Sequence, residues 1–230
     1  MSRVFLCEEW YNNCMIRFFM VFLLLCPPPV AQAYEVSLQS VDVPYDVVTL
    51  AGEPENQQTI LGELNNAPEM YEVKSDVDFT LTVEIRAVPG ELSRPQFSGI
   101  IVRQKDTLGV EEVARMKAID ASWARVIDGT TGLAYQSGPF FSEKVKAGTY
   151  HIEVSTPDNS GKYMLVVGNK DESTGYFATL RTIDLVYDFY GLSTMQMFHS
   201  PYIHYPIGIV VLMLLITATW YWNRRRNRYA

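Results

Sequence analysis

The sequence predicts a mainly β protein: an antiparallel β-sandwich, followed by a juxtamembrane amphipathic helix and one C-terminal transmembrane helix. Three observations support this prediction. Apolar and polar residues alternate along many short segments, turn residues separate these segments, and one long apolar tract stands near the C-terminus. A period of two is typical of half-buried strands, and many closely spaced strands are typical of a sandwich.

The clearest strand is 79–86, where every second residue from Phe79 to Ile85 is apolar and the residues between them are polar. One face of this strand is therefore buried and the other is solvated. Turn pairs such as Asp128-Gly129 and Gly138-Pro139 bound other segments of this kind. We expect further strands at 35–41, 58–64, 70–74, 97–104, 122–127, 140–145, 149–155 and 162–167. Residues 110–118 fit either a helix or a strand.

The segment 148–167 predicts a hairpin. Its connection, Asp158-Asn-Ser-Gly161, contains residues that tolerate positive φ in a tight turn. His151 is then a surface residue on the outer, solvated face. The residues expected to point inward are Tyr150, Ile152 and Val154 in the first strand and Tyr163, Leu165 and Val167 in the second.

The same residues carry a resemblance to a known family. Residues 145–154 (VKAGTYHIEV) and 159–167 (NSGKYMLVV) resemble the final strands of bacterial pre-peptidase C-terminal (PPC-like) domains, where an "aGtYyv.V" strand precedes a "G.Y.L.v" strand. Upstream, 62–64, 70–73 and 79–85 are similar to the family's opening "G.l … y.f … v.i.v" progression. The resemblance covers about residues 58–168 and implies a jelly-roll-like sandwich that acts as an accessory binding or secretion module. Some relatives bind calcium or collagen, but no acidic cluster at ligand spacing supports a metal site here.

The apolar tract 202–222 contains no Asp, Glu, Lys or Arg and is 21 residues long. A bilayer core about 30 Å thick requires about 20 helical residues. We therefore expect a transmembrane helix at 201–222 rather than a buried helix of a soluble domain. Aromatic residues that favour the headgroup layer flank it: Tyr202, Tyr205, Trp220 and Trp222. By the positive-inside rule, the tail 223–230 is cytoplasmic because it carries Arg224, Arg225, Arg226 and Arg228.

The N-terminal segment has the parts of a secretory signal. Arg17 precedes the apolar run 18–25, and Ala31 and Ala33 suit the peptidase. We expect a signal peptide at 1–33, and the acidic residues before Met15 favour translation from Met15. Export and a C-terminal anchor predict a single-pass protein of the cell membrane with its N-terminus outside. Its sandwich would occupy 34–170 and its juxtamembrane segment 171–200.

Composition excludes several classes of function. Residues 34–206 carry 13 Lys and Arg against 24 Asp and Glu, and such an acidic domain repels the phosphates of nucleic acid. All three cysteines precede residue 34, which excludes disulfides and thiolate catalysis in the ectodomain. An exported domain without cysteine favours a prokaryotic envelope protein.

Between the sandwich and the tract, residues 174–190 predict a helix that Ser173 or Thr174 caps and Gly191 ends. Its polar stripe of Arg181, Asp184 and Asp188 is narrow, so a broad apolar surface must be covered. Three covers remain open: the underside of the sandwich, a partner's membrane domain, or the membrane interface. The residues expected to contact a partner are Leu180, Ile183, Val186, Tyr187, Tyr190, Met195 and Phe198.

The ectodomain contains none of the motifs of nucleophilic, zinc-dependent or phosphate-binding enzymes. We therefore expect a non-catalytic module without a cofactor that binds a glycan, an envelope polymer or a protein outside the cytoplasm. Trp123 or Tyr135 would form a sugar platform, although a core role suits Trp123 better. One alternative is an accessory subunit of a membrane protein complex, docked through its juxtamembrane and transmembrane helices. A hydrolase using acidic pairs such as Glu111 and Glu112, or Asp76 and Asp78, is the other.

Overall fold

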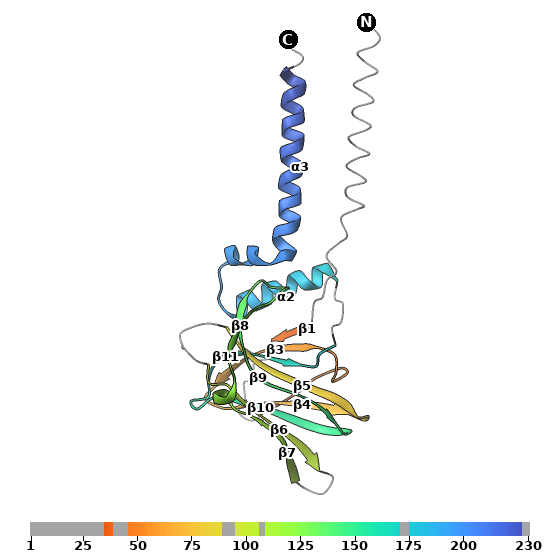
Figure 1. The fold of residues 1–230 in the computed structure, drawn as a ribbon, viewed down its shortest axis with the longest axis vertical. Helices are drawn as coiled ribbons and strands as arrows, with labels where there is room; N and C mark the ends of the chain where they lie inside the picture. Colours follow the sequence, from red (N-terminus) through yellow and green to blue (C-terminus); the bar gives the residue numbers. More distant parts are fainter. Residues whose placement is uncertain (1–34, 39–45, 89–94, 106–108, 171–174, 227–230) are drawn as a thin grey trace. The chain divides into compact units, whose positions relative to one another are not determined.

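The chain folds into two β-sheets packed face to face (Figure 1). This computed structural model describes residues 35–38, 46–88, 95–105, 109–170 and 175–226. The expected sandwich is confirmed. The signal peptide predicted at 1–33, the capping residues Ser173 and Thr174, and Arg228 lie outside the described residues.

The first sheet has six strands in the order β1-β3-β11-β5-β9-β8, and the second has five in the order β2-β4-β10-β6-β7. Most neighbours are antiparallel, as expected, but β1 pairs with β3 and β2 with β4 in parallel. The six strands are Glu35–Leu38, Gln58–Asn65, Ser160–Val167, Phe79–Ala87, Ala134–Val145 and Ala124–Ile127 in that order. The five are Val47–Thr49, Glu69–Ser75, Gly148–Ser155, Ser98–Lys105 and Gly109–Met116.

The segment 110–118, whose sequence fits either a helix or a strand, forms most of strand β7, which ends at Met116. A single turn of 3-10 helix, η1 (Ala118–Asp120), follows it. β7 is an edge strand, and its largely exposed surface carries Glu111, Glu112 and Arg115. This mixture of polar and apolar residues at an exposed edge explains why the pattern was ambiguous.

The hairpin predicted at 148–167 is wrong in its pairing. β10 lies in the five-stranded sheet and β11 in the six-stranded sheet, so the turn between them crosses from one sheet to the other. The alternation was correct, because the inward residues of both strands meet in the same core. In the turn, Asp158 accepts hydrogen bonds from the hydroxyls of Thr156 and Ser160, and Asn159 has φ +45°.

The core between the sheets consists of the alternating apolar residues of both. Phe79 and Tyr150 meet edge to face at 5.7 Å between ring centroids, and each fully buried side chain of this kind contributes about 1.5–3 kcal/mol. The buried members from the central strands are Ile60, Tyr71, Val73, Leu81, Val83, Ile85, Ile101, Ile152, Val154, Tyr163, Leu165 and Val167.

The six-stranded sheet is buried on its second face as well. Helix α2 (Tyr176–Phe189) packs there, and its Val186 forms a separate buried cluster with Leu61, Met164 and Val166. β11 is therefore buried at five consecutive residues, 163–167, instead of at every second one. Of the three covers considered for this helix, the structure places the sandwich against its buried face.

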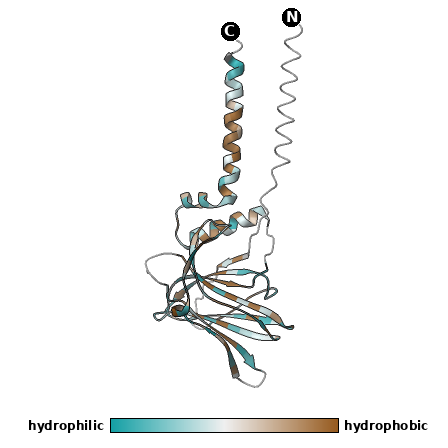
Figure 2. Ribbon diagram, in the orientation of Figure 1, coloured by the Kyte–Doolittle hydropathy of each residue, from teal (hydrophilic) through white to brown (hydrophobic). Residues whose placement is uncertain are grey.

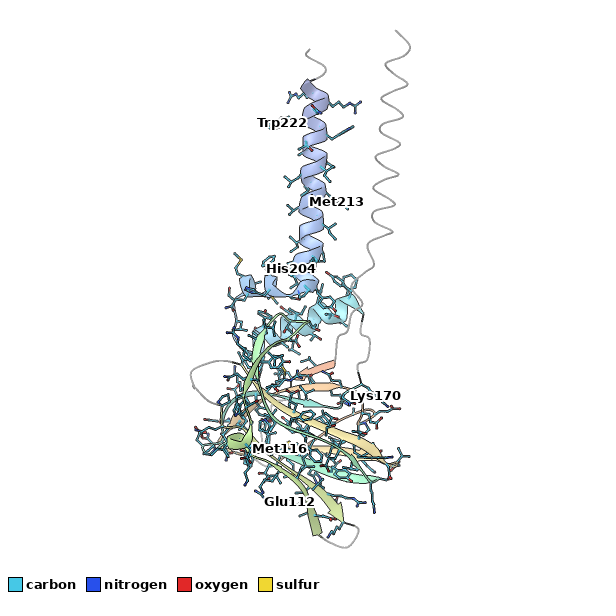
Figure 3. The ribbon with its side chains drawn as sticks, in the orientation of Figure 1. Glu112, Met116, Lys170, His204, Met213 and Trp222 are labelled. Atoms are coloured by element: carbon cyan, nitrogen blue, oxygen red, sulfur yellow. The ribbon has the colours of Figure 1, made fainter. Side chains whose placement is uncertain are left out.

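The chain then continues through the 3-10 helix η2 (Thr194–His199) into α3 (Pro201–Arg226). Gly191 ends the preceding turn with φ +62°, as expected. α3 is long and apolar enough to cross a membrane, and none of its most apolar stretch is buried within the chain. Figure 2 shows the hydrophobic middle of α3, and Figure 3 places Met213 between His204 and Trp222.

Candidate ligand cleft and apolar collar

A cleft of ≈ 780 Å³ lies at one end of the sandwich and is lined by residues of both sheets. Four separate parts of the chain form its wall: the entry to β6, the segment around η1, Gln136 on β9, and the end of β10 with the turn that follows it. Their residues in the described part of the chain are Pro95, Gln96, Ser98, Lys117, Ala118, Ile119, Ala121, Ser122, Trp123, Gln136, Ser155, Thr156 and Pro157. A space of this volume accommodates a small ligand or a short stretch of a polymer.

Trp123 is a rigid part of this wall. Its indole Nε1 donates to the carbonyl of Ala118 at 2.9 Å, and its backbone adopts φ +48°. Gly138 makes room for the ring, since a Cβ there would lie 2.4 Å from the ring atom Cζ3 of Trp123. The half-buried ring also packs against the main core. Trp123 thus combines the core role and the exposed ring that the sequence presented as alternatives.

One residue that lines the cleft has an unsatisfied acceptor. The side-chain oxygen Oε1 of Gln136 is buried without a hydrogen-bond partner in the described part of the chain. A buried amide oxygen in this state is costly, by about 1–3 kcal/mol, unless a ligand or water supplies a donor. Around it the wall offers hydroxyl and amide groups and a single charged residue, Lys117. The lining therefore suits an uncharged ligand with many hydroxyl groups.

Tyr135 does not contribute to the cleft. It precedes Gln136 on β9 and therefore points to the opposite face of the sheet, where it is buried. There the guanidinium of Arg86 lies 4.6 Å from its ring centroid and also bonds Glu84. Burial raises the pKa of the Tyr135 hydroxyl. A role as a sugar platform is excluded for Tyr135 by this position.

A buried carboxylate, which the sequence did not indicate, lies inside the sandwich. Glu69 is only 4% exposed, and its Oε2 accepts hydrogen bonds from Tyr71 at 2.7 Å and Tyr163 at 2.5 Å. The two hydroxyls are also 2.7 Å apart, and burial raises the pKa of both tyrosines. Gly62 leaves space for this group, since a Cβ there would lie 2.5 Å from Tyr163.

The loop between β8 and β9 joins the sandwich to the helical segment. Asp128 is buried, and its Oδ1 accepts from the amides of Thr130 and Thr131 and from the Thr131 hydroxyl, at 2.6–2.9 Å. This fixes two loop carbonyls: that of Thr131 accepts from Tyr187 at 3.1 Å, and that of Thr130 accepts from Ser200 at 2.6 Å. α2 and the residue before α3 are therefore held to the sandwich by the same loop.

The residues expected to contact a partner divide into two groups. Ile183, Val186 and Tyr187 are buried within the chain, and Leu180 and Tyr190 are half-buried. Burial raises the pKa of Tyr190. Met195 and Phe198 on η2 are exposed.

Phe177, at the start of α2, was not singled out from the sequence but is 79% exposed. The preceding residue, Tyr176, is also exposed, and its ring packs edge to face against the ring of Phe177. We refer to Phe177, Met195, Phe198 and Tyr205 as the apolar collar. Contacts among α2, η2 and α3 bring the elements of this collar together.

The expected membrane-interface and topology residues lie on α3. Tyr202 is buried against the rest of the chain, whereas Tyr205 and Trp222 are exposed and Trp220 is half-buried. Arg224 stacks on Trp220, with its guanidinium 5.3 Å from the ring centroid. α3 continues through Arg225 to Arg226, beyond the expected end at 222.

The acidic pairs on which the alternative of a hydrolase depended are not among the residues that line the cleft. Glu112 bonds Arg115 and Glu111 lies 3.8 Å from Lys105, both on β7 or its partner strand. Asp78 accepts from the amide of Ala147. His151, expected on the surface, is half-buried and lies 3.3 Å from Glu72 on the neighbouring strand. Within the described ranges, no group of three or more His, Cys, Asp or Glu is placed to hold a metal ion.

These features define a two-sheet β-sandwich with an end cleft, followed by an apolar helix. No protein-family profile matches the chain, and no curated protein matches its sequence. Among solved structures, the chain is similar to the pre-peptidase C-terminal domain of a collagenase from Bacillus anthracis. The TM-score is 0.35 at 15% identity, over 56% of this chain and 98% of that one.

A second solved structure is a β-glucosidase from Paenibacillus barengoltzii, with a TM-score of 0.23 and 13% identity. The match covers 61% of this chain but only 14% of the glucosidase. Likeness at these values does not establish a shared fold or activity. The relation to pre-peptidase C-terminal domains therefore remains a resemblance.

Proposed function

We propose that this protein is a membrane-anchored, non-catalytic binding module that takes an uncharged glycan or envelope polymer into the cleft beside Trp123. The unsatisfied Oε1 of Gln136 supports this proposal most directly. A ligand hydroxyl that reaches this buried oxygen would supply its missing donor, in a cleft that also contains the ring of Trp123, on which a sugar can stack. The acidic charge of the domain favours an uncharged ligand, because it repels anionic polymers.

The anchor is part of the same proposal. α3 would cross the membrane, with Arg224 to Arg228 in the cytoplasm and the sandwich outside, after removal of a signal peptide at 1–33. The sandwich would then present its cleft to the envelope of a prokaryotic cell. Labelling from outside intact cells tests the orientation: a reagent that reaches Lys170 but not Tyr229 supports it, and the reverse contradicts it.

The cleft is tested by binding of the full chain, in nanodiscs, to an array of neutral and acidic glycans. Gln136→Leu keeps the volume of the side chain and removes the acceptor, so we expect about a tenfold loss of affinity for a neutral glycan. Ile119→Ser removes an exposed apolar part of the wall without touching the core. Val110→Ser, on the far edge strand β7, is the matched control and leaves binding unchanged. Equal binding by all three variants would place the ligand elsewhere.

The second candidate is an accessory subunit of a membrane protein complex. Exposure of Met195 and Phe198 beside α3 favours it, because a partner's membrane domain would cover these side chains. Purification in mild detergent distinguishes the two: a stoichiometric membrane protein that is lost from Met195→Ser and Phe198→Ser variants supports the subunit. Purification as a single species with intact glycan binding supports the module.

A further inference from the structure

The collar exposes large apolar side chains, whereas the large apolar residues of α2 from Leu180 onward are buried or half-buried. Phe177, Met195 and Phe198 are 79%, 75% and 46% exposed, whereas the opposite face of α2 is fully buried on the sandwich. Singly exposed apolar residues are common on protein surfaces. Three that converge on the entry to one apolar helix require a common cover.

The chain itself fixes how close the collar lies to α3. Phe198 precedes Pro201, the first residue of α3, by three residues, which span at most about 10 Å. At the other end of the collar, the Tyr176 hydroxyl donates to the carbonyl of Tyr202 at 2.9 Å. Phe177, the next residue, is therefore held at the same first turn of α3.

The length of α3 places this turn in a bilayer. About 20 residues cross a hydrocarbon core of about 30 Å, and counting back from Trp222 reaches Ile203. The first turn of α3 then lies in the outer interfacial layer, a few Å thick. Aromatic and long apolar side chains favour this layer.

The charges on α2 limit how far the contact extends. Arg181, Asp184 and Asp188 occupy the same exposed face as Phe177, further along the helix. Only the start of α2 can enter the layer, because these groups keep the remainder in water. The two acidic groups also exclude attraction to anionic lipid as the cause, so the contact is apolar.

We infer that the collar inserts into the outer interfacial layer of the bilayer, so that lipid is its partner and the sandwich is held against the membrane surface. This inference depends on the proposed membrane anchor. It differs from simple tethering, in which the ectodomain would stand away from the lipid on a flexible connection. Lipid also explains why, between residues 175 and 200, the exposed large apolar side chains lie on α2 and η2, the elements that contact α3.

The test is a nitroxide scan of the full chain in palmitoyl-oleoyl phosphatidylcholine vesicles, with Cys7, Cys14 and Cys26 changed to serine. Phe177→Cys, Met195→Cys and Phe198→Cys carry the label in turn. Two control positions give the reference values: Leu212→Cys in the middle of α3 for lipid, and Ile119→Cys, where Ile119 is 88% exposed at the cleft, for water. We expect the ratio of collisions with oxygen to collisions with a nickel chelate to be several-fold higher in the collar than at 119.

Three results overturn the inference in different ways. If the collar labels give the same collision ratio as Ile119→Cys while Leu212→Cys gives the high ratio expected in lipid, α3 is a membrane anchor but the collar lies in water. Labels that are immobile and shielded from both reagents show a protein partner in place of lipid. A water-exposed Leu212→Cys label removes the membrane anchor itself, and with it the proposed function.

Discussion

The hydroxyl of Tyr176 donates a hydrogen bond to the carbonyl of Tyr202, the carbonyl that would ordinarily accept from residue 206 of the same helix. Residue 206 is a proline and has no N–H to donate. α2 therefore supplies a donor to the first turn of α3 at the position where the sequence of α3 withholds one. The contact couples the helix on the sandwich to the apolar helix.

Tyr176→Phe tests this coupling. Loss of the hydroxyl removes one donor from the Tyr202 carbonyl, at a cost of about 1 kcal/mol. We expect faster amide exchange in the first two turns of α3 and a small fall in Tm, with the sandwich strands unchanged. Tyr205→Phe, an exposed tyrosine on the same turn, is the control. Equal exchange in both variants would show that the hydrogen bond does not hold α3.

The Asp128 loop has a larger role. Asp128→Ala leaves the amides of Thr130 and Thr131 without their acceptor, and hydrogen bonds to a charged group contribute about 1.5–3 kcal/mol. We expect a fall in unfolding free energy of this order, measured by urea denaturation. Exchange at α2 and η2 should rise too, because the loop carbonyls that accept from Tyr187 and Ser200 lose their support.

Asp120→Ala is the matched change at an exposed aspartate of η1. It should alter neither stability nor exchange. If Asp128→Ala lowers stability but leaves exchange at α2 and η2 unchanged, the loop stabilises the sandwich alone and does not couple it to the helices.

The cover that α2 gives to the six-stranded sheet predicts where the ectodomain can be cut. A chain ending at residue 170 exposes Leu61, Met164 and Val166, at about 1.5–3 kcal/mol for each side chain fully returned to water. We expect it to bind an apolar dye such as ANS and to melt well below a chain ending at residue 200, which keeps α2. Equal Tm for the two fragments would mean that α2 adds nothing to the fold.

The sequence indicated this cover only indirectly. Strand periodicity identified the inward residues of β5, β10 and β11 correctly, because burial between two sheets imposes a period of two. The same reasoning did not account for Met164 and Val166, which are buried on the other face of β11. The signal for the second buried face was the uninterrupted apolar run 163–167, which is typical of a strand covered on both sides. Nothing local identified α2 as its cover.

The placement of β10 and β11 in different sheets, and the cleft, could not be predicted from the sequence for a related reason. A turn residue such as Asn159 fixes a local reversal, but it does not determine whether the next strand joins the same sheet or the facing one. The cleft brings together Ser98, Trp123, Gln136 and Thr156, which are distant in the sequence. The exclusion of Tyr135 from the cleft also depended on the register of β9, which sets the face that Tyr135 reaches.

The buried Glu69 cluster predicts how stability depends on alkaline pH. The pKa values of Tyr71 and Tyr163 are raised above the ordinary tyrosine value of 10.0, mainly by burial. The unfolded chain releases these protons near pH 10, whereas the folded chain retains them. Above pH 10 the folded state binds more protons than the unfolded state, so stability falls as pH rises. Below pH 10 the two states bind equally and this contribution is constant.

Tyr163→Phe separates the two effects of this hydroxyl. At neutral pH it removes a donor from the buried Glu69 carboxylate, and we expect a loss of about 1–3 kcal/mol of unfolding free energy. Above pH 10 the variant has one fewer proton to retain, so its stability should decline less steeply, by up to about 1.4 kcal/mol per pH unit. Urea denaturation from pH 7 to pH 11 measures both quantities, with Tyr221→Phe on the exposed surface of α3 as the control. Parallel curves for the wild type and Tyr163→Phe above pH 10 would show that Tyr163 ionises in the folded state, which its hydrogen bond to a buried carboxylate opposes.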